Sequence, residues 1–189
     1  MKNAVGLLGH ERYRHDPSAV AELTQTIEQG MSRLNRRVDG LLSLAGAAAG
    51  PPVELSELGP LVRDGMDSVR PLAEARQQAL DLDLPLVPVY GWVHAERYLA
   101  ALQNVLDNAV KYTPPGGRVG VQLRAAGRRA VALVSDSGPG IPRELWERVF
   151  DPFFRHLPQA AGGLGLGLPI ARTCLRAMGG ALWVERSSP

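Results

Sequence analysis

A run of small residues and prolines, AGAAAGPP at residues 45–52, divides the sequence into two parts with different patterns. Alanine, glycine and proline in this order are typical of a helix end followed by a linker. Before the run, apolar residues recur with helical periodicity. After it, helical and alternating patterns are mixed. We therefore expect two domains, over residues 1–50 and 51–189.

The first part predicts a helical hairpin. Asp16 and Pro17 are favourable as the N-cap and first residue of a helix that runs to about Leu44. On this helix two rows repeat every seven residues and form a seam: Val20, Ile27, Leu34 and Leu41, and Thr24, Met31, Val38 and Ala45. A seam of this length needs a long partner, which predicts a homodimer through residues 18–45 with a four-helix bundle. The alternative is a lone amphipathic helix packed on its own domain.

The second part predicts an α/β (α+β) sandwich with helices on one face of a sheet. The expected helices cover residues 56–78, 94–112 and 164–178. The expected strands cover residues 80–84, 85–90, 118–123, 129–134 and 181–185, with the third and fourth forming a hairpin.

Composition excludes several classes of protein. Hydrophobic residues make up 45% of the 189 residues, which supports a packed core. A net charge of +2 predicts no nucleic-acid partner. The single cysteine, Cys174, excludes an internal disulfide and is compatible with a reducing compartment. No apolar run approaches the roughly 20 residues that span a bilayer, so we expect no membrane segment in this chain and a cytoplasmic location.

Three polar residues share one face of the helix expected over residues 94–112. Asn104, Asn108 and Lys111 fall within roughly 60° of one another at 100° per residue, opposite an apolar face. A solvated face is one interpretation, but asparagine is a poor helix former. The other is a nucleotide site, since an amide oxygen can complete a Mg²⁺ shell and a lysine can neutralise phosphate oxygens.

Two glycine-rich segments follow. Asp136-Ser-Gly138-Pro-Gly140-Ile141 comes after a predicted strand, and its carboxylate is suited to accept a hydrogen bond from an amino group such as that of adenine. A turn capped by the aspartate is the alternative. The second segment, residues 162–168 (GGLGLGL), opens a helix and predicts a phosphate cradle rather than a linker, because linkers are rich in serine instead of leucine. It matches neither a P-loop nor a Rossmann motif.

All three phenylalanines lie between these segments, in Phe150-Asp-Pro-Phe153-Phe154-Arg155. Core packing is one interpretation. We also expect Phe150 and Phe153 to anchor residues 155–163 as a segment that closes over a nucleotide.

Together these segments resemble the asparagine box, first glycine box, phenylalanine box and second glycine box of sensor histidine kinases, in the family order. The resemblance covers about residues 18–186. It implies the Bergerat (GHKL) ATP-binding fold, with ATP and Mg²⁺ as cofactors. It also implies transfer of the γ-phosphoryl group of ATP to a histidine, and from there to the receiver domain of a response regulator.

The resemblance also implies roles for individual residues. Asn104 and Lys111 correspond to catalytic positions, and Asn108 with Asn104 to the Mg²⁺ ligands. Asp136 would recognise adenine by accepting a hydrogen bond from its amino group. The nucleotide pocket would further include Tyr112, Gly138, Gly140, Ile141, Phe154, Arg155, Gly163, Leu164, Gly165, Leu166, Gly167 and Leu168.

Two departures leave alternatives open. The phosphoacceptor histidine would precede Met1, since Met1-Lys-Asn resembles the end of its box. His10 mimics that box, but it lies only seven residues before Pro17. The family's last strand is also missing after residue 186. A catalytically silent ATP-binding and dimerisation module is therefore an alternative.

A GHKL ATPase or serine kinase is another alternative. Asn104 stands where hydrolysing relatives carry glutamate, and an amide cannot act as a general base. The long seam is unusual for the serine kinases. Whether the parent kinase is anchored in a membrane stays open.

Overall fold

The computed structural model of the chain describes residues 52–156 and 164–187. The chain divides into two units, residues 1–42 and 43–189, and every described residue belongs to the second. The helical hairpin, its seam, His10, the domain boundary near residue 50 and Gly163 lie outside the described residues and stay predictions.

The described residues form five strands, three α-helices and two short 3₁₀ helices. In chain order these are β1 (Glu54–Glu57), α4 (Leu58–Ala75), β2 (Ala79–Asp83), β3 (Tyr90–Val93), α5 (Ala95–Tyr112), β4 (Arg118–Ala126), β5 (Arg129–Asp136), η1 (Arg143–Leu145), η2 (Arg148–Phe150) and α6 (Gly167–Ala177).

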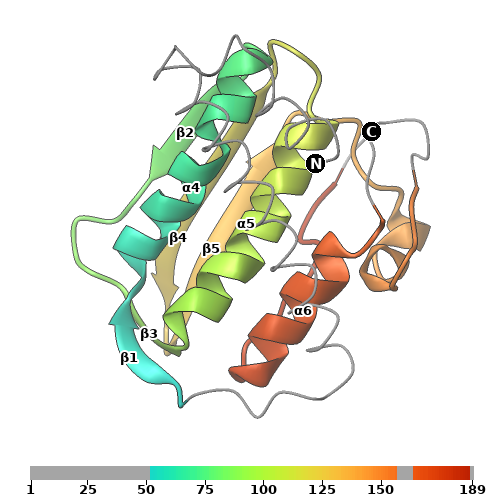
Figure 1. Cartoon of the computed structure of the whole chain (residues 1–189). Helices are drawn as coiled ribbons and strands as arrows, with labels where there is room; N and C mark the ends of the chain where they lie inside the picture. The colour runs from blue at the N-terminus through green and yellow to red at the C-terminus, as the bar shows by residue number, and fades with distance from the viewer. Residues whose placement is uncertain (1–51, 157–163, 188–189) are drawn as a thin grey trace, which may run out of the picture. The chain divides into compact units, whose positions relative to one another are not determined.

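Helices α4 and α5 lie over one face of the sheet β2-β4-β5, and α6 packs beside α5 (Figure 1). β2 pairs with β4 in parallel, and β4 pairs with β5 as an antiparallel hairpin in which Val121 lies opposite Val134. The inward side chains of β4, from Val119 to Leu123, are buried against the helices. The predicted α/β sandwich with helices on one sheet face is confirmed.

Helix α5 is central to the core. Leu102, Leu106 and Val110 face the sheet and α4, and Leu106 and Val110 are fully buried. Helix α4 passes so close that a Cβ atom on Gly65 would lie 2.7 Å from Cδ2 of Leu102. Glycine is unfavourable inside a helix, but here it permits this close approach of two helices. Tyr98 is also part of this core, and burial raises the pKa of its hydroxyl to about 12.

The expected strand over residues 85–90 is wrong. β3 begins at Tyr90 and pairs with β1, with Leu55 opposite Trp92. Pro85 and Pro88 lack an N–H group to donate to a strand ladder. Ser56 and Glu57, the last two residues of β1, were expected to begin a helix, but they pair with β3 instead.

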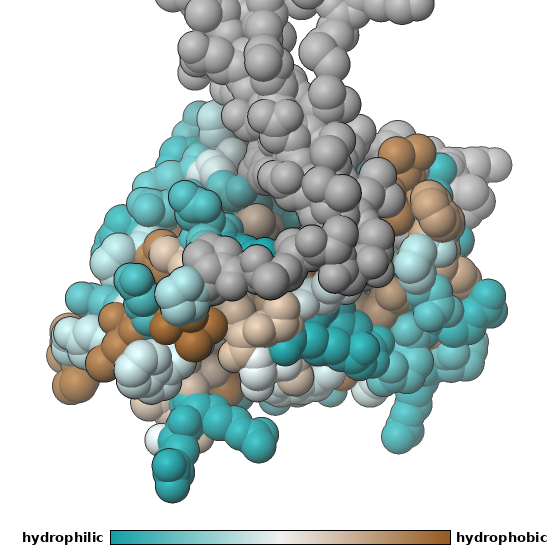
Figure 2. All heavy atoms as spheres, turned by 60° about the horizontal axis from the view of Figure 1, so that its bottom comes forward, coloured by the Kyte–Doolittle hydropathy of each residue, from teal (hydrophilic) through white to brown (hydrophobic). Residues whose placement is uncertain are grey.

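The pair β1–β3 buries one face only. Gly91 lies against Leu58, and Val93 is buried, whereas Leu55, Tyr90 and Trp92 are more than half exposed. Figure 2 shows this end of the molecule, where hydrophobic atoms are exposed among hydrophilic ones.

The expected strand over residues 181–185 is not formed either. These residues belong to no strand, although Leu182 and Val184 are half-buried and Trp183 and Glu185 are exposed. The alternation of a strand is therefore present without the ladder of hydrogen bonds. Within the described residues, β5 has β4 as its only sheet neighbour. No helix in this part of the chain is long and apolar enough to cross a bilayer.

Candidate functional site

The polar face of α5 lies opposite its buried face, as the spacing predicts. The helix begins after His94, whose Nδ1 accepts a hydrogen bond from the Arg97 N–H at 3.4 Å. One turn before Asn108, Asn104 Nδ2 donates to the Ala100 carbonyl at 2.8 Å. This bond fixes the amide of Asn104, so that its oxygen is the atom available to a ligand.

The second glycine segment meets this face. Gly167 is the first residue of α6, and a Cβ atom there would lie 3.3 Å from Asn108 Nδ2 and 3.4 Å from Asn104 Oδ1. Residues 59 and 63 positions apart in the sequence thus come together as one cluster of two amides and a helix N-terminus. Such an N-terminus presents unpaired N–H groups and a positive dipole end to an anion.

Replacing Gly167 with alanine should lower the affinity for nucleotide without lowering the stability of the fold. Alanine is a better helix former than glycine by about 1 kcal/mol, so the unfolding midpoint should stay constant or rise. The added methyl group would press on the two amides, and affinity for an adenine nucleotide should fall several-fold. Thermal unfolding and calorimetric titration of the same sample would check this, and a fall in both quantities would contradict it.

The first glycine segment packs on the end of α5. Asp136 Oδ1 accepts the Gly138 N–H at 2.8 Å. A Cβ atom on Gly138 would lie 2.6 Å from that oxygen and 3.2 Å from the Tyr112 carbonyl oxygen. Asp136 therefore caps the turn that it begins, which is the alternative interpretation of this segment. The turn also holds the exposed Asp136 carboxylate close to Gly138, which lies against Tyr112. Gly140 adopts φ +74°, a conformation that favours glycine.

Lys111 and Tyr112 lie at the same end of α5. The Lys111 Nζ is 5.0 Å from the centre of the Tyr112 ring, within cation–π range. Ile141 continues the first glycine segment, and its N–H donates to Ser187 Oγ at 2.6 Å while its carbonyl accepts from Trp146 Nε1 at 2.9 Å. The backbone of Ile141 is thus occupied by intramolecular bonds.

The phenylalanine segment only partly matches expectation. Phe150 is buried and anchors η2, but Phe153 is 67% exposed and adopts φ +66°. Its backbone N–H donates to the Gly165 carbonyl at 3.0 Å. Phe153 therefore anchors through the main chain and not through its ring. The Arg148 Cζ atom lies 4.6 Å from the centre of the Phe154 ring, and Arg155 is half-buried.

The leucines of the second glycine segment differ from one another. Leu166 is buried in a small cluster with Ile170 and Cys174, Leu168 is half-buried, and Leu164 is 59% exposed. Leu166 thus contributes to the core, and only its backbone lies beside the site. Burial raises the pKa of the Cys174 thiol, which disfavours the reactive thiolate.

Sequence reasoning missed two residues that contact the end of α5, Arg76 and Gln78. Both follow α4 and donate to carbonyls of residues 110–113. No motif contains them, and their partners are more than 30 positions away.

Among the described residues, no group of three or more His, Cys, Asp or Glu side chains is placed to hold a metal ion. Any metal in this site would therefore rely on amide oxygens, ligand oxygens and water.

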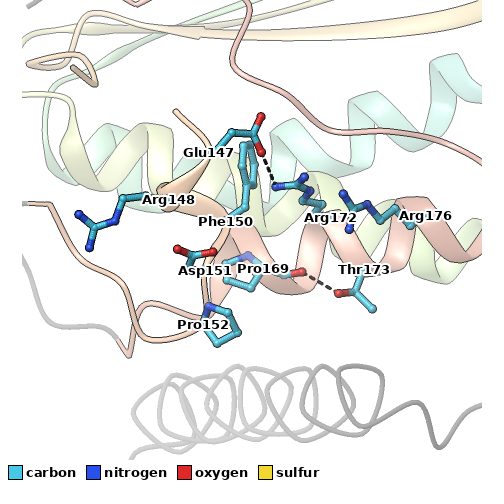
Figure 3. A pocket seen from close by; sticks show the side chains of 9 residues that line it. All are labelled: Glu147, Arg148, Phe150, Asp151, Pro152, Pro169, Arg172, Thr173 and Arg176. Atoms are coloured by element: carbon cyan, nitrogen blue, oxygen red, sulfur yellow. Dashed lines mark hydrogen bonds and ion pairs between the residues drawn. The ribbon is translucent and has the colours of Figure 1, made fainter. Parts of the chain in front are cut away.

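A pocket of about 420 Å³ lies elsewhere, between η2 and α6. Figure 3 shows its side chains, including the ion pair of Arg172 with Glu147 at 3.2 Å and the Thr173 hydroxyl bonded to the Pro169 carbonyl. The ring of Phe150 lies 4.8 Å from the Arg172 guanidinium. None of the residues predicted to bind nucleotide lines this pocket, so we do not assign it to the same site.

Comparison with known proteins gives a consistent family match. The family described as "Histidine kinase-, DNA gyrase B-, and HSP90-like ATPase" matches residues 94–189. The chain is 35% identical over 174 residues to the signal transduction histidine-protein kinase/phosphatase MprB of Mycolicibacterium smegmatis, an alignment that covers 89% of this chain and 33% of that protein. The chain thus spans about a third of the length of the curated relatives it matches.

Solved structures agree with this match. The mycobacterial sensor histidine kinase MprB superposes with a TM-score of 0.62 at 32% identity, covering 69% of this chain and 83% of that one. Full-length ShkA, solved in complex with AMPPNP, superposes with a TM-score of 0.66 at 28% identity and covers 89% of this chain and 36% of that one.

Proposed function

Because the chain belongs to the family of histidine kinase-, DNA gyrase B- and HSP90-like ATPases, we propose that it is the ATP-binding catalytic region of a two-component sensor histidine kinase. The observation that carries the proposal is the contact of Gly167 with Asn104 and Asn108, at 3.3–3.4 Å from a Cβ position. It brings an amide pair and a helix N-terminus together, and Lys111 follows Asn108 by three residues on the same helix. Amide oxygens, helix N–H groups and a lysine are groups that bind the phosphates of a nucleotide with its metal ion.

The residues present fit a magnesium ion bound together with nucleotide phosphates. Mg²⁺ prefers hard oxygen donors and retains several waters, so one or two protein ligands are enough. Asn108 and Asn104 would hold it, and the space that a Cβ on Gly167 would fill stays open beside them. When bound, magnesium-ATP supplies the phosphoryl group and neutralises part of its charge.

Each remaining predicted residue has a role in this proposal. Lys111 contributes a point charge to the phosphates, and Tyr112 lines the pocket. The Asp136 carboxylate, which the Gly138 N–H holds in place, accepts a hydrogen bond from the adenine amino group. The neighbouring residues complete the pocket: Gly140, Ile141, Phe154, Arg155, Gly163, Leu164, Gly165, Leu166, Gly167 and Leu168.

The parent reaction transfers the γ-phosphoryl group to a histidine nitrogen and then to an aspartate of a response regulator receiver domain. Little covalent chemistry falls to the protein, since positioning and charge neutralisation dominate phosphoryl transfer. The name of the MprB relative, a signal transduction histidine-protein kinase/phosphatase, supports this class. We further propose a cytoplasmic location and dimerisation through residues 18–45, with the domain boundary near residue 50.

Replacing Asn108 with alanine tests the proposal directly. Calorimetric titration of the wild type with AMPPNP and Mg²⁺ should show binding, and Asn108→Ala should weaken it by roughly 10- to 100-fold, the scale typical of lost metal-site contacts. Gln122→Ala is the matched control, because it removes an amide that donates a hydrogen bond to Asp83 at 2.6 Å on the outer sheet face. Equal affinities of wild type and Asn108→Ala would reject the assignment.

A second assay separates the remaining alternatives. The chain is incubated with γ-labelled ATP and a separate polypeptide that carries a histidine box. A kinase should label that polypeptide. A silent module would bind nucleotide without labelling it, and an ATPase would release inorganic phosphate rapidly.

A further inference from the structure

The connection between α4 and β2 holds two polar residues that no motif includes, Arg76 and Gln78. Gln78 is only 6% exposed, and Arg76 is half-buried. Gln77 between them adopts φ +55°, which turns the chain sharply after α4. We call these three residues the 76–78 corner.

The corner caps the end of α5. Gln78 Nε2 donates to the Val110 carbonyl at 3.0 Å and to the Thr113 carbonyl at 2.7 Å. Arg76 Nη2 donates to the Lys111 carbonyl at 3.2 Å and to the Thr113 carbonyl at 2.9 Å. The last carbonyls of a helix have no donor within the helix, and a cation at this end also complements the helix dipole. The corner therefore supplies from a distant segment what α5 lacks.

The capped turn is also the one that carries site residues. Lys111 and Tyr112 are the last two residues of α5, and the Tyr112 carbonyl lies against Gly138 of the first glycine segment. The position of this turn thus sets where the backbone of Lys111 and Tyr112 lies relative to Gly138.

The corner also holds the turn that follows α5. The Gly116 N–H donates to the Arg76 carbonyl at 3.1 Å, and the Ala79 N–H donates to the Gly117 carbonyl at 2.8 Å. One residue later, the Arg118 N–H donates to Ser137 Oγ at 2.9 Å, next to Gly138. Hydrogen bonds therefore connect the corner with the turn after α5, and this turn leads directly to Arg118 and its bond with Ser137 of the first glycine segment.

We propose that Arg76 and Gln78 are positioning residues of the nucleotide site. They hold the last turn of α5 so that Lys111 and Tyr112 face the Asp136–Gly138 turn at a fixed distance. They act on the ligand only through that turn. This inference rests on the proposed function, because it concerns the same site.

The test compares nucleotide affinity with stability. Gln78→Met keeps a side chain of similar length without a donor, and Arg76→Met removes both the fork and the charge. Each should weaken binding of AMPPNP with Mg²⁺ by about tenfold, measured by calorimetry well below the unfolding midpoint. Arg76→Lys keeps the charge and one donor and should recover part of the loss. Should Arg76→Met not fold, Arg76→Lys still provides the comparison with the wild type.

Two controls distinguish positioning from a general structural role. Val69→Ala truncates a side chain that is 1% exposed on α4 and should lower the unfolding midpoint while affinity stays within twofold. Gln122→Met removes an exposed amide and should change neither quantity. If Arg76→Met and Gln78→Met behaved like Val69→Ala, with a lower unfolding midpoint but unchanged affinity, the positioning role would be overturned. Failure of the wild type to bind nucleotide would overturn the proposed function and this inference with it.

Discussion

Replacing Gly165 with alanine should abolish binding of AMPPNP, whereas the same replacement at Gly127 should leave binding intact. Both glycines have positive φ, +69° at Gly165 and +62° at Gly127, so both variants pay the same conformational penalty of about 1–2 kcal/mol. Their surroundings differ. A Cβ atom on Gly165 would lie 2.6 Å from the Phe154 carbonyl oxygen, whereas a Cβ atom on Gly127 would meet no atom within 4 Å.

The clash at Gly165 involves main-chain atoms, which cannot rotate away as a side chain can. It would separate Gly165 from Phe153 and break the hydrogen bond that joins the two segments. Because α6 begins two residues later, the displacement would reach Gly167 and its contact with the asparagines. Calorimetry on both variants measures the difference. If Gly165→Ala bound nucleotide as tightly as Gly127→Ala, the close approach of Gly165 to the backbone of Phe153 and Phe154 would not be required for nucleotide binding.

The largest loss of stability is expected from Leu106→Ala. The Leu106 side chain is fully buried between α4 and the sheet, and truncation of such a leucine typically costs about 2–5 kcal/mol. Leu72→Ala is the matched control, because Leu72 is 43% exposed on α4 and its truncation should cost less than about 1 kcal/mol.

Urea unfolding followed by tryptophan fluorescence suits this comparison. All three tryptophans of the chain, Trp92, Trp146 and Trp183, lie in the part that the structure describes. The signal therefore reports on the α/β unit and not on residues 1–51. Equal midpoints for the two leucine variants would show that α5 does not hold the core together.

Short-range patterns carried most of the information about the candidate site. The spacing of Asn104, Asn108 and Lys111 depends only on helix periodicity, and the apolar face opposite them is buried as expected. The glycine segments were recognisable because glycine adopts positive φ at little cost and has no Cβ atom to prevent a close approach. Gly138 and Gly140 illustrate this, one through its contact with Tyr112 and the other through its positive φ.

Several features could not be predicted in this way. A strand was expected over residues 85–90, whereas the strand forms at Tyr90–Val93, where β1 supplies a hydrogen-bonding partner. The strand expected over residues 181–185 has the right alternation, but alternation does not ensure a ladder. Phe153 was expected to anchor through its ring, and its ring is exposed while its backbone makes the contact.

The sequence by itself determined which residues share a helix face or a turn, because those relations involve neighbours within a few positions and follow from backbone geometry. Only the tertiary structure decided that Gly167 touches Asn104 and Asn108, and that Arg76 and Gln78 cap the end of α5. Such contacts join residues 32 or more positions apart. They depend on how the helices and strands pack together, which periodicity within one segment does not specify.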